Sequence, residues 1–200
     1  MLNVLLNIFI TAVISYLIGS IPTGYLIVKS KTGQDIRNVG SGSTGATNVK
    51  RVLGKNWFFT VMLLDALKGA LPVILAAKFL HSNLGLYPVI AAIAVIIGHS
   101  KPIFLDFKGG KSVASGVGTI LALNWHVGIV IAIVWSIITY ISKYVSLGSI
   151  IALAISPFVM WYLHNPIAYV AYCALGAIYI IYLHRTNIVR LIKGEENKVR

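Results

Sequence analysis

The chain has 200 residues, of which 58% are hydrophobic and 11% are charged, and its mean hydropathy is +0.85. A soluble domain carries about a quarter of its residues as charged side chains, so this composition excludes an ordinary soluble protein and indicates a chain that faces lipid. The formal charge of +12 suits anionic lipid headgroups and anionic substrates, whereas too little soluble surface remains for a nucleic-acid-binding module.

Runs of about 20 mostly apolar residues mark the expected membrane-spanning helices. In chain order, they cover roughly residues 4–28, 57–80, 86–105, 109–124, 125–142, 146–163 and 166–184. The fourth run is short and rich in serine, alanine and glycine, which suits close packing inside a bundle and leaves a partial span open. The sequence therefore predicts an all-α, polytopic membrane protein with about seven transmembrane helices in a single domain, residues 1–200.

The basic residues predict how this bundle is oriented. Of the 17 lysines and arginines, 15 fall on one side of the membrane if there are seven spans; the exceptions are Lys68, within the second span, and Lys78, near its end. Six spans would scatter the charges over both faces. Because basic loops stay in the cytoplasm, we expect the N-terminus outside, the C-terminus inside, and the polar chemistry on the cytoplasmic face.

A glycine- and serine-rich segment between the first two spans is the first candidate for chemistry. Glycines allow turns in which successive backbone N–H groups point into one concavity, and an arginine at the end can make two bonds to one phosphate. A flexible linker is the alternative, which the composition fits equally well. The candidate phosphate ligands of this segment are Ser41, Gly42, Gly45, Thr47, Asn48 and Arg51.

A second candidate site precedes the short fourth helix. Gly109 and Gly110 lead into this helix, so we expect its N-terminal amides and Lys111 to form an anion site. The segment is not a phosphate-binding P-loop, because Leu105 stands where that motif requires glycine. A snorkelling positive-inside lysine is the simpler alternative for Lys111. His99 is a candidate base, with capping of a helix end as its alternative.

The last candidates lie near the C-terminus and inside the second span. If the seventh helix continues past its span, His184 and Asn187 stand on one face of it. A basic juxtamembrane tail explains the neighbouring arginines but not this histidine and asparagine. Ser149, at the start of the sixth helix, lies within reach of the same face. Asp65 and Lys68 are three residues apart, which predicts an ion pair facing the bundle interior.

These segments, in this order on a seven-helix chain, resemble the acyl-phosphate:glycerol-3-phosphate acyltransferase family (PlsY) of bacteria. The resemblance runs from Ser15 to Glu195 and is clearest in residues 41–51, 98–99 with 107–114, and 184–191 with 194–195. Two positions depart from the family pattern: Ser43 replaces a usual asparagine, and Lys101 stands where an aromatic residue is often found.

The resemblance implies transfer of a fatty acyl group from acyl phosphate to the 1-hydroxyl of glycerol 3-phosphate, giving lysophosphatidic acid. It implies no metal, no cofactor and neither acyl-CoA nor acyl carrier protein. The expected partners are the two substrates and membrane lipid, in the bacterial inner membrane, with a monomeric chain. The expected ligands of acyl phosphate are Lys111, Gly109, Gly110 and the 41–48 loop; those of glycerol 3-phosphate are Arg51, Lys111, His184, Asn187 and Ser149.

Two alternatives to this function come from other classes. A transporter for an organic anion would need midplane sites and internal repeats, whereas the motifs here cluster at one face. An acyl-CoA-dependent acyltransferase would need the signature His-x-x-x-x-Asp, and no histidine of this chain has aspartate five residues on. Within the favoured reaction, His184 is either the general base or a group that only orients glycerol 3-phosphate.

Overall fold

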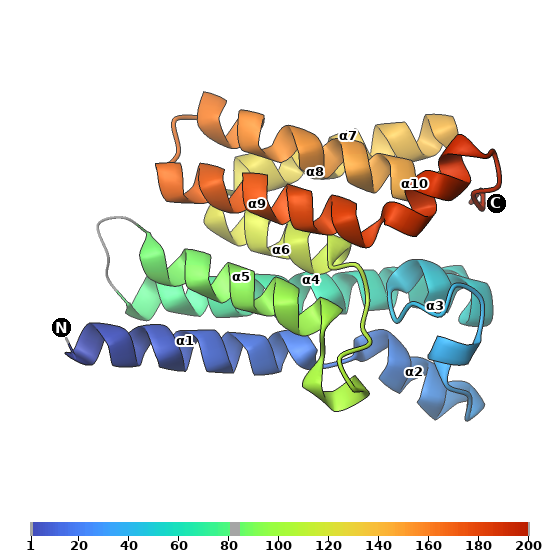
Figure 1. Cartoon of the computed structure of the whole chain (residues 1–200), viewed down its shortest axis with the longest axis horizontal. Coiled ribbons are helices and arrows are strands. Elements are labelled where there is room, and N and C mark those ends of the chain that lie inside the picture. The colour runs from blue at the N-terminus through green and yellow to red at the C-terminus, as the bar shows by residue number, and fades with distance from the viewer. Residues whose placement is uncertain (1, 81–84, 200) are drawn as a thin grey trace.

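The computed structural model describes residues 2–80 and 85–199, which are all-helical as the sequence predicts. The longer helices run side by side along the long axis of the molecule, and the N- and C-termini lie at opposite ends (Figure 1). These helices are α1 (Leu2–Ser20), α4 (Lys55–Phe79), α5 (Leu86–Ser100), α6 (Val113–Leu123), α7 (Trp125–Ser142), α8 (Val145–Tyr162) and α9 (Ile167–Leu183).

Short helices gather at the end of the bundle where the C-terminus lies (Figure 1). They are α2 (Thr23–Thr32), the 3-10 turn η1 (Ile36–Asn38), α3 (Ala46–Leu53) and α10 (Arg185–Ile192); a second 3-10 turn, η2 (Ile103–Leu105), follows α5. A small core of Val28, Ile36, Val49 and Val61 fixes α2, η1 and α3 to α4. The glycine-rich segment between η1 and α3 is therefore held on a packed base.

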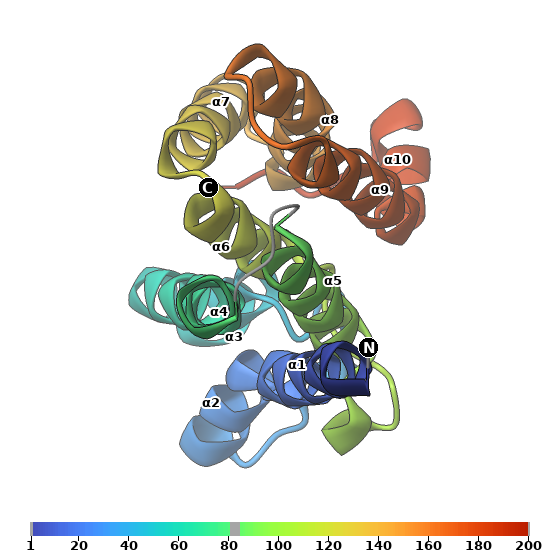
Figure 2. The ribbon, with the colours of Figure 1, turned by 90° about the vertical axis from the view of Figure 1, so that its left-hand side faces the viewer.

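The central helix α6 packs against both α4 and α7, as an end-on view shows (Figure 2). Its small residues permit this approach, since a Cβ added to Gly118 would lie 2.0 Å from the carbonyl oxygen of Ala66, and one added to Gly69 of α4 would lie 2.3 Å from that of Ser115. The close packing predicted for the short fourth helix is confirmed.

Large apolar side chains cover the outer surface of the bundle, as in a protein surrounded by lipid. Leu63, Phe158 and Ile178 are 58%, 70% and 66% exposed. Among the described residues, five helices are long and apolar enough to cross a membrane, or six if α9 and the bent-off α10 count as one span. Helix α6 has 11 residues and a length of about 16 Å, about half of a bilayer core. A crossing number of seven stays a prediction.

The first predicted span, residues 4–28, lies within the candidate span Leu2–Thr32, but the helix in it is interrupted between α1 and α2. Pro22 has no N–H to donate to the preceding turn, and its φ and ψ of −90° and 71° lie outside the helical region. At the break, the carbonyl of Ile21 accepts hydrogen bonds from Lys68 Nζ at 2.7 Å and from the N–H of Thr23 at 3.1 Å. Hydropathy alone sees one continuous apolar run here and misses the break.

The start of the fourth predicted span is wrong, whereas the ends of the third and seventh spans agree closely with the structure. The predicted span 86–105 has the same bounds as the candidate span Leu86–Leu105. Within it, α5 ends at Ser100, two residues before Pro102, and a loop and η2 form the rest. Helix α6 begins at Val113, four residues later than expected. The seventh helix does not continue: it ends at Leu183, and α10 departs from it at 62°. His184 occupies that bend, so His184 and Asn187 do not share the face of one continuous helix.

Candidate active site

A cavity of about 390 Å³ lies near the end of the bundle that carries α3 and α10. Polar side chains from the 41–51 segment, the loop before α6, the start of α8 and the C-terminal segment line one part of it. Apolar side chains line the other part: Phe58 and Met62 of α4, Val117 and Leu121 of α6, and Ala132 and Trp135 of α7. The cavity thus joins a cationic compartment to an apolar one.

Most of the predicted site residues meet at this cavity. The ones that line it are Ser41, Gly45, Thr47, Asn48, Arg51, Lys111, Ser149, His184 and Asn187. Among the described lining residues, Gly42, Gly109 and Gly110 are absent. The three distant segments therefore converge on one cavity, while the ligand contacts predicted for their residues stay predictions.

Asn48 organises the glycine-rich segment rather than presenting free donors to a ligand. Its side chain is buried; Oδ1 accepts the N–H of Ser41 at 2.9 Å, and Nδ2 donates to the carbonyls of Val39 and Ser43 at 2.9 and 3.0 Å. A Cβ added to Gly40, whose φ is +62°, would lie 2.2 Å from Asn48 Oδ1. The loop backbone is thus held in place before any ligand arrives.

Lys111 lies at the centre of the cationic compartment. Its Nζ donates a hydrogen bond to Oδ1 of Asn187, although 76 residues separate the two in sequence. Burial lowers the pKa of Lys111 to about 8; Arg190 and Arg51 act in the same direction, and the carboxylate of Glu196 opposes them. The positive charge of Lys111 is only partly balanced by the carboxylate of Glu196, so it is available to attract a phosphate that enters the cavity.

Gly109 and Gly110 contribute to the site in a way that their sequence position did not suggest. Their N–H groups donate to the carbonyls of Ser100 and His99 at 3.2 and 3.1 Å, so these amides already have partners. Ser112 stands between the pair and the helix as the N-cap of α6. The glycines anchor the Lys111 loop to the end of α5, and their predicted contact with phosphate stays a prediction.

His184 lies buried at the bend between α9 and α10. Its Nδ1 is 2.8 Å from the carbonyl of Ile180. A carbonyl only accepts, so Nδ1 carries the proton and Nε2 is the nitrogen left for the cavity in the neutral ring. Ser149 also lines the cavity, where its Oγ donates to the carbonyl of Val145 at 2.8 Å and accepts from Trp135 Nε1 at 3.2 Å.

Glu196 is a site residue that sequence reasoning missed. Its carboxylate accepts hydrogen bonds from Asn187 Nδ2 at 2.6 Å, Arg190 Nε at 2.7 Å and Ser146 Oγ at 2.8 Å. Burial raises the pKa of Glu196, but these three hydrogen bonds and the Arg190 charge outweigh it and leave the pKa below its usual value. The available signal was its rarity, because the chain has only five acidic residues.

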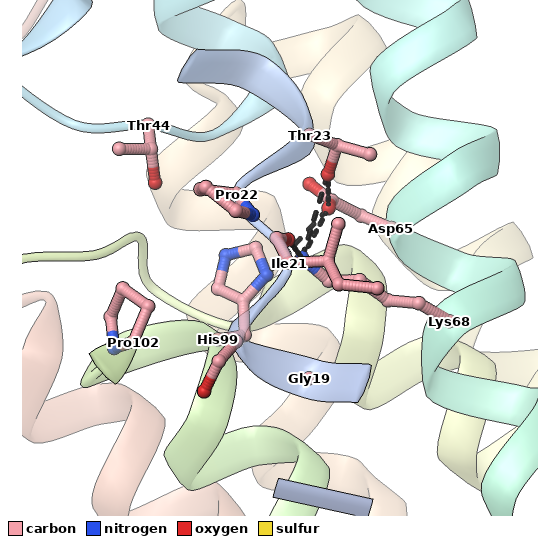
Figure 3. A pocket seen from close by; sticks show the side chains of 10 residues that line it. Gly19, Ile21, Pro22, Thr23, Thr44, Asp65, Lys68, His99 and Pro102 are labelled. Carbon is pink, nitrogen blue, oxygen red and sulfur yellow. Dashed lines mark hydrogen bonds and ion pairs between the residues drawn. The ribbon is translucent and has the colours of Figure 1, made fainter. Parts of the chain in front are cut away.

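A second polar cluster lies inside the bundle, next to the break between α1 and α2 (Figure 3). Asp65 Oδ1 pairs with Lys68 Nζ at 2.8 Å, as predicted, and accepts a hydrogen bond from Thr23. His99 Nδ1 lies 3.7 Å from the same carboxylate oxygen and 3.0 Å from Ser115 Oγ. The cluster joins the α1–α2 break, α4, α5 and α6 at one point.

Comparison with known proteins agrees with this arrangement. A family model described as glycerol-3-phosphate acyltransferase matches residues 9–194. The glycerol-3-phosphate acyltransferase of Nostoc sp. is 45% identical, over 93% of this chain and 89% of that protein. The corresponding enzyme of Prochlorococcus marinus strain MIT 9312 is 47% identical, over 93% of this chain and 94% of its own length.

Two solved structures share the fold. A crystal structure of PlsY, an integral membrane glycerol 3-phosphate acyltransferase, in its glycerol 3-phosphate form superposes with a TM-score of 0.91. It is 37% identical and covers 96% of each chain. The lysophosphatidic acid form of PlsY has a TM-score of 0.87 at 34% identity, over 96% of this chain and 95% of its own.

The fold and the two-part cavity define an integral membrane enzyme that handles an anionic group joined to an apolar one. More specifically, the chain belongs to the glycerol-3-phosphate acyltransferase family and is an acyltransferase of phospholipid synthesis. The family resemblance and the enzyme class predicted from the sequence are confirmed, and family membership decides against the transporter.

Proposed function

We propose that this chain transfers a fatty acyl group from acyl phosphate to the 1-hydroxyl of glycerol 3-phosphate. The observation that carries the proposal is the single cavity in which the cations Lys111, Arg51 and Arg190 adjoin an apolar wall of α4, α6 and α7 side chains. An acyl phosphate has this combination of phosphate and hydrocarbon, and glycerol 3-phosphate adds a second phosphate. Attack forms a C–O bond to the acyl carbon, breaks its bond to phosphate and releases one proton.

The acyl phosphate is the substrate that the loop before α6 suits best. Lys111 and the first residues of α6, Ser112 to Ala114, line the cavity together, so the positive end of the helix dipole adjoins the ammonium group. Both favour the negative charge that grows on the carbonyl oxygen and on the departing phosphate. The hydrocarbon would then lie against Val117 and Leu121, farther along the same face of α6.

Glycerol 3-phosphate fits between the other polar groups. The guanidinium group of Arg51 can donate two parallel hydrogen bonds to its phosphate, while Asn187, His184 and Ser149 can orient its hydroxyls. Acyl phosphate is already activated, so holding the 1-hydroxyl beside the acyl carbon supplies much of the rate enhancement. Either Nε2 of His184 or the departing phosphate accepts the proton.

The proposed function is tested by which acyl donor the protein uses. Purified protein in lipid is given radiolabelled glycerol 3-phosphate with acyl phosphate, acyl-CoA or acyl carrier protein thioester in separate reactions. We expect labelled lysophosphatidic acid with acyl phosphate alone, because a phosphate fits beside Lys111 and a bulky thioester carrier lacks a matching site. Turnover with either thioester at the rate of acyl phosphate would contradict the proposal.

We infer that the cavity faces the cytoplasm of a bacterial inner membrane. The motif loops carry most of the basic residues, and the two termini lie at opposite ends of the bundle. A reporter fused after Arg200 should therefore be active in the cytoplasm, and one before Met1 should be active outside. Reporters active on the same side would contradict both the odd number of spans and the single-faced site.

The pH dependence of the reaction should expose the charge on Lys111. A lysine is cationic below its pKa, so with a pKa of about 8 the free enzyme should lose kcat/KM for acyl phosphate as the pH rises through that value. Lys111→Arg keeps its charge at every pH of the assay and should lack this alkaline limb. An unchanged limb in the arginine variant would assign the titration to another group.

A further inference from the structure

The ring of His99 fills the space beside the glycine pair that precedes Lys111. His99 is buried at the end of α5, and its carbonyl accepts the N–H of Gly110. A Cβ added to Gly110 would lie 2.3 Å from His99 Nε2, so the ring packs directly against the Gly110 backbone. Neither Gly109 nor Gly110 has a φ in the left-handed region; the space that His99 occupies, not the backbone conformation, requires glycine at 110.

The opposite edge of the ring is held by two other helices. Ser115, in the first turn of α6, places its Oγ 3.0 Å from His99 Nδ1, and Asp65 of α4 lies 3.7 Å from the same nitrogen. Asp65 is itself fixed by Lys68 and Thr23 (Figure 3). Nδ1 of His99 therefore faces Ser115 and Asp65, while Nε2 lies beside the Gly110 backbone, and the ring also lines the cavity.

We propose that His99 is a positioning residue, whose ring presses on Gly110 and thereby directs Lys111 into the cavity toward Asn187. The proposal rests on the proposed phosphate-binding role of Lys111. The chain of contacts runs from the buried Asp65–Lys68 pair through the imidazole to the loop, so α4 and α5 together determine where the ammonium group lies. His99, which also lines the cavity, therefore acts on the reaction through the position of Lys111.

The test combines two substitutions at the contact between His99 and Gly110: one adds a methyl group there, and the other removes the part of the ring that the methyl group would meet. Gly110→Ala puts a methyl group where His99 Nε2 lies, and His99→Asn keeps an amide near Ser115 while it deletes the far side of the ring. We expect each single variant to raise the KM for acyl phosphate and the inhibition constant of inorganic phosphate by about tenfold, as expected when a charge-assisted bond is lost. We expect the double variant to recover to within about threefold of wild type, since its methyl group refills the vacated space.

Gly109→Ala is the matched control. A Cβ at Gly109 would lie 2.2 Å from the carbonyl oxygen of His99 and 2.5 Å from Pro102 Cδ, and the first of these is backbone. His99→Asn should therefore leave the Gly109→Ala defect unrelieved. The variant midpoints of thermal unfolding in detergent are measured in parallel, so that loss of folding is separated from loss of phosphate affinity.

Two results together support the positioning role. The first is recovery when His99→Asn is combined with Gly110→Ala but not with Gly109→Ala. The second is a raised KM for acyl phosphate and a raised inhibition constant of inorganic phosphate in folded His99→Asn. Three results would each overturn it: a His99→Asn/Gly110→Ala variant with constants as high as those of Gly110→Ala, a Gly110→Ala variant with wild-type constants, or equal recovery when His99→Asn is combined with Gly109→Ala. If Gly110→Ala does not fold, folded His99→Asn with unchanged phosphate constants overturns it as well. Lys111→Ala separates the two proposals, because full activity in that variant would refute the phosphate site itself.

Discussion

Lys111→Ala is expected to abolish measurable turnover while the protein stays folded in detergent. The variant removes the cation nearest the expected phosphate, and it leaves Oδ1 of Asn187 without the donor that it has in the structure. Loss of one donor that stabilises developing negative charge typically costs about 10²–10³-fold in kcat. Assays of labelled glycerol 3-phosphate incorporation, with size-exclusion profiles of the purified variant, give the measurement.

Arg51→Ala should have a comparable effect through the second phosphate. Arg51 is exposed toward the cavity from α3, where its guanidinium can make two bonds to glycerol 3-phosphate. Lys108→Ala is the matched control, because Lys108 is an exposed cation of the same loop as Lys111 and does not line the cavity. Near-normal activity in both Lys111→Ala and Arg51→Ala, or equal loss in Lys108→Ala, would contradict the phosphate assignment.

The helices were the most predictable part of this protein, because hydropathy reports directly on contact with lipid. The predicted span 125–142 has the same bounds as α7, and the predicted span 146–163 is shifted by one residue. The error lies at the start of α6, which was predicted at residue 109 and begins at Val113. Hydropathy also did not indicate the helix interruptions at Pro22 and before Pro102, which lie inside the candidate spans Leu2–Thr32 and Leu86–Leu105. A proline signals such a break, but hydropathy does not indicate that Lys68 donates a hydrogen bond to the carbonyl of Ile21 there.

Most residues that line the cavity could be predicted from the sequence, but the role of each residue could not. Residue type pointed to Lys111, Arg51 and His184, since cations and a histidine in basic loops suit a phosphate site. Type and spacing could not distinguish a glycine that binds phosphate from one that makes room for a ring, because the ring of His99 meets Gly110 only in the folded chain. The partners of Glu196 lie up to 50 residues away in sequence, which placed it beyond local patterns.

Substitution of His184 should separate binding from proton transfer. Nδ1 of this ring donates to the Ile180 carbonyl, so only Nε2 can serve the substrate. Glutamine can place an amide near the Nε2 position, whereas asparagine can place one near Nδ1 and leaves the Nε2 position empty. The two variants therefore test opposite ends of the ring, and each serves as the control for the other.

We expect His184→Gln to raise the KM for glycerol 3-phosphate about tenfold and to change kcat less, as the loss of one hydrogen bond to a charged substrate would do. The departing phosphate lies beside the attacking hydroxyl and can take its proton, so the ring needs only to orient the hydroxyl. His184→Asn should then be the poorer enzyme, because it offers nothing at the Nε2 position. Steady-state kinetics from pH 5 to 9 give both parameters. A fall in kcat of about 10²–10⁴ at unchanged KM, with loss of the neutral-pH inflection, would instead make His184 the general base.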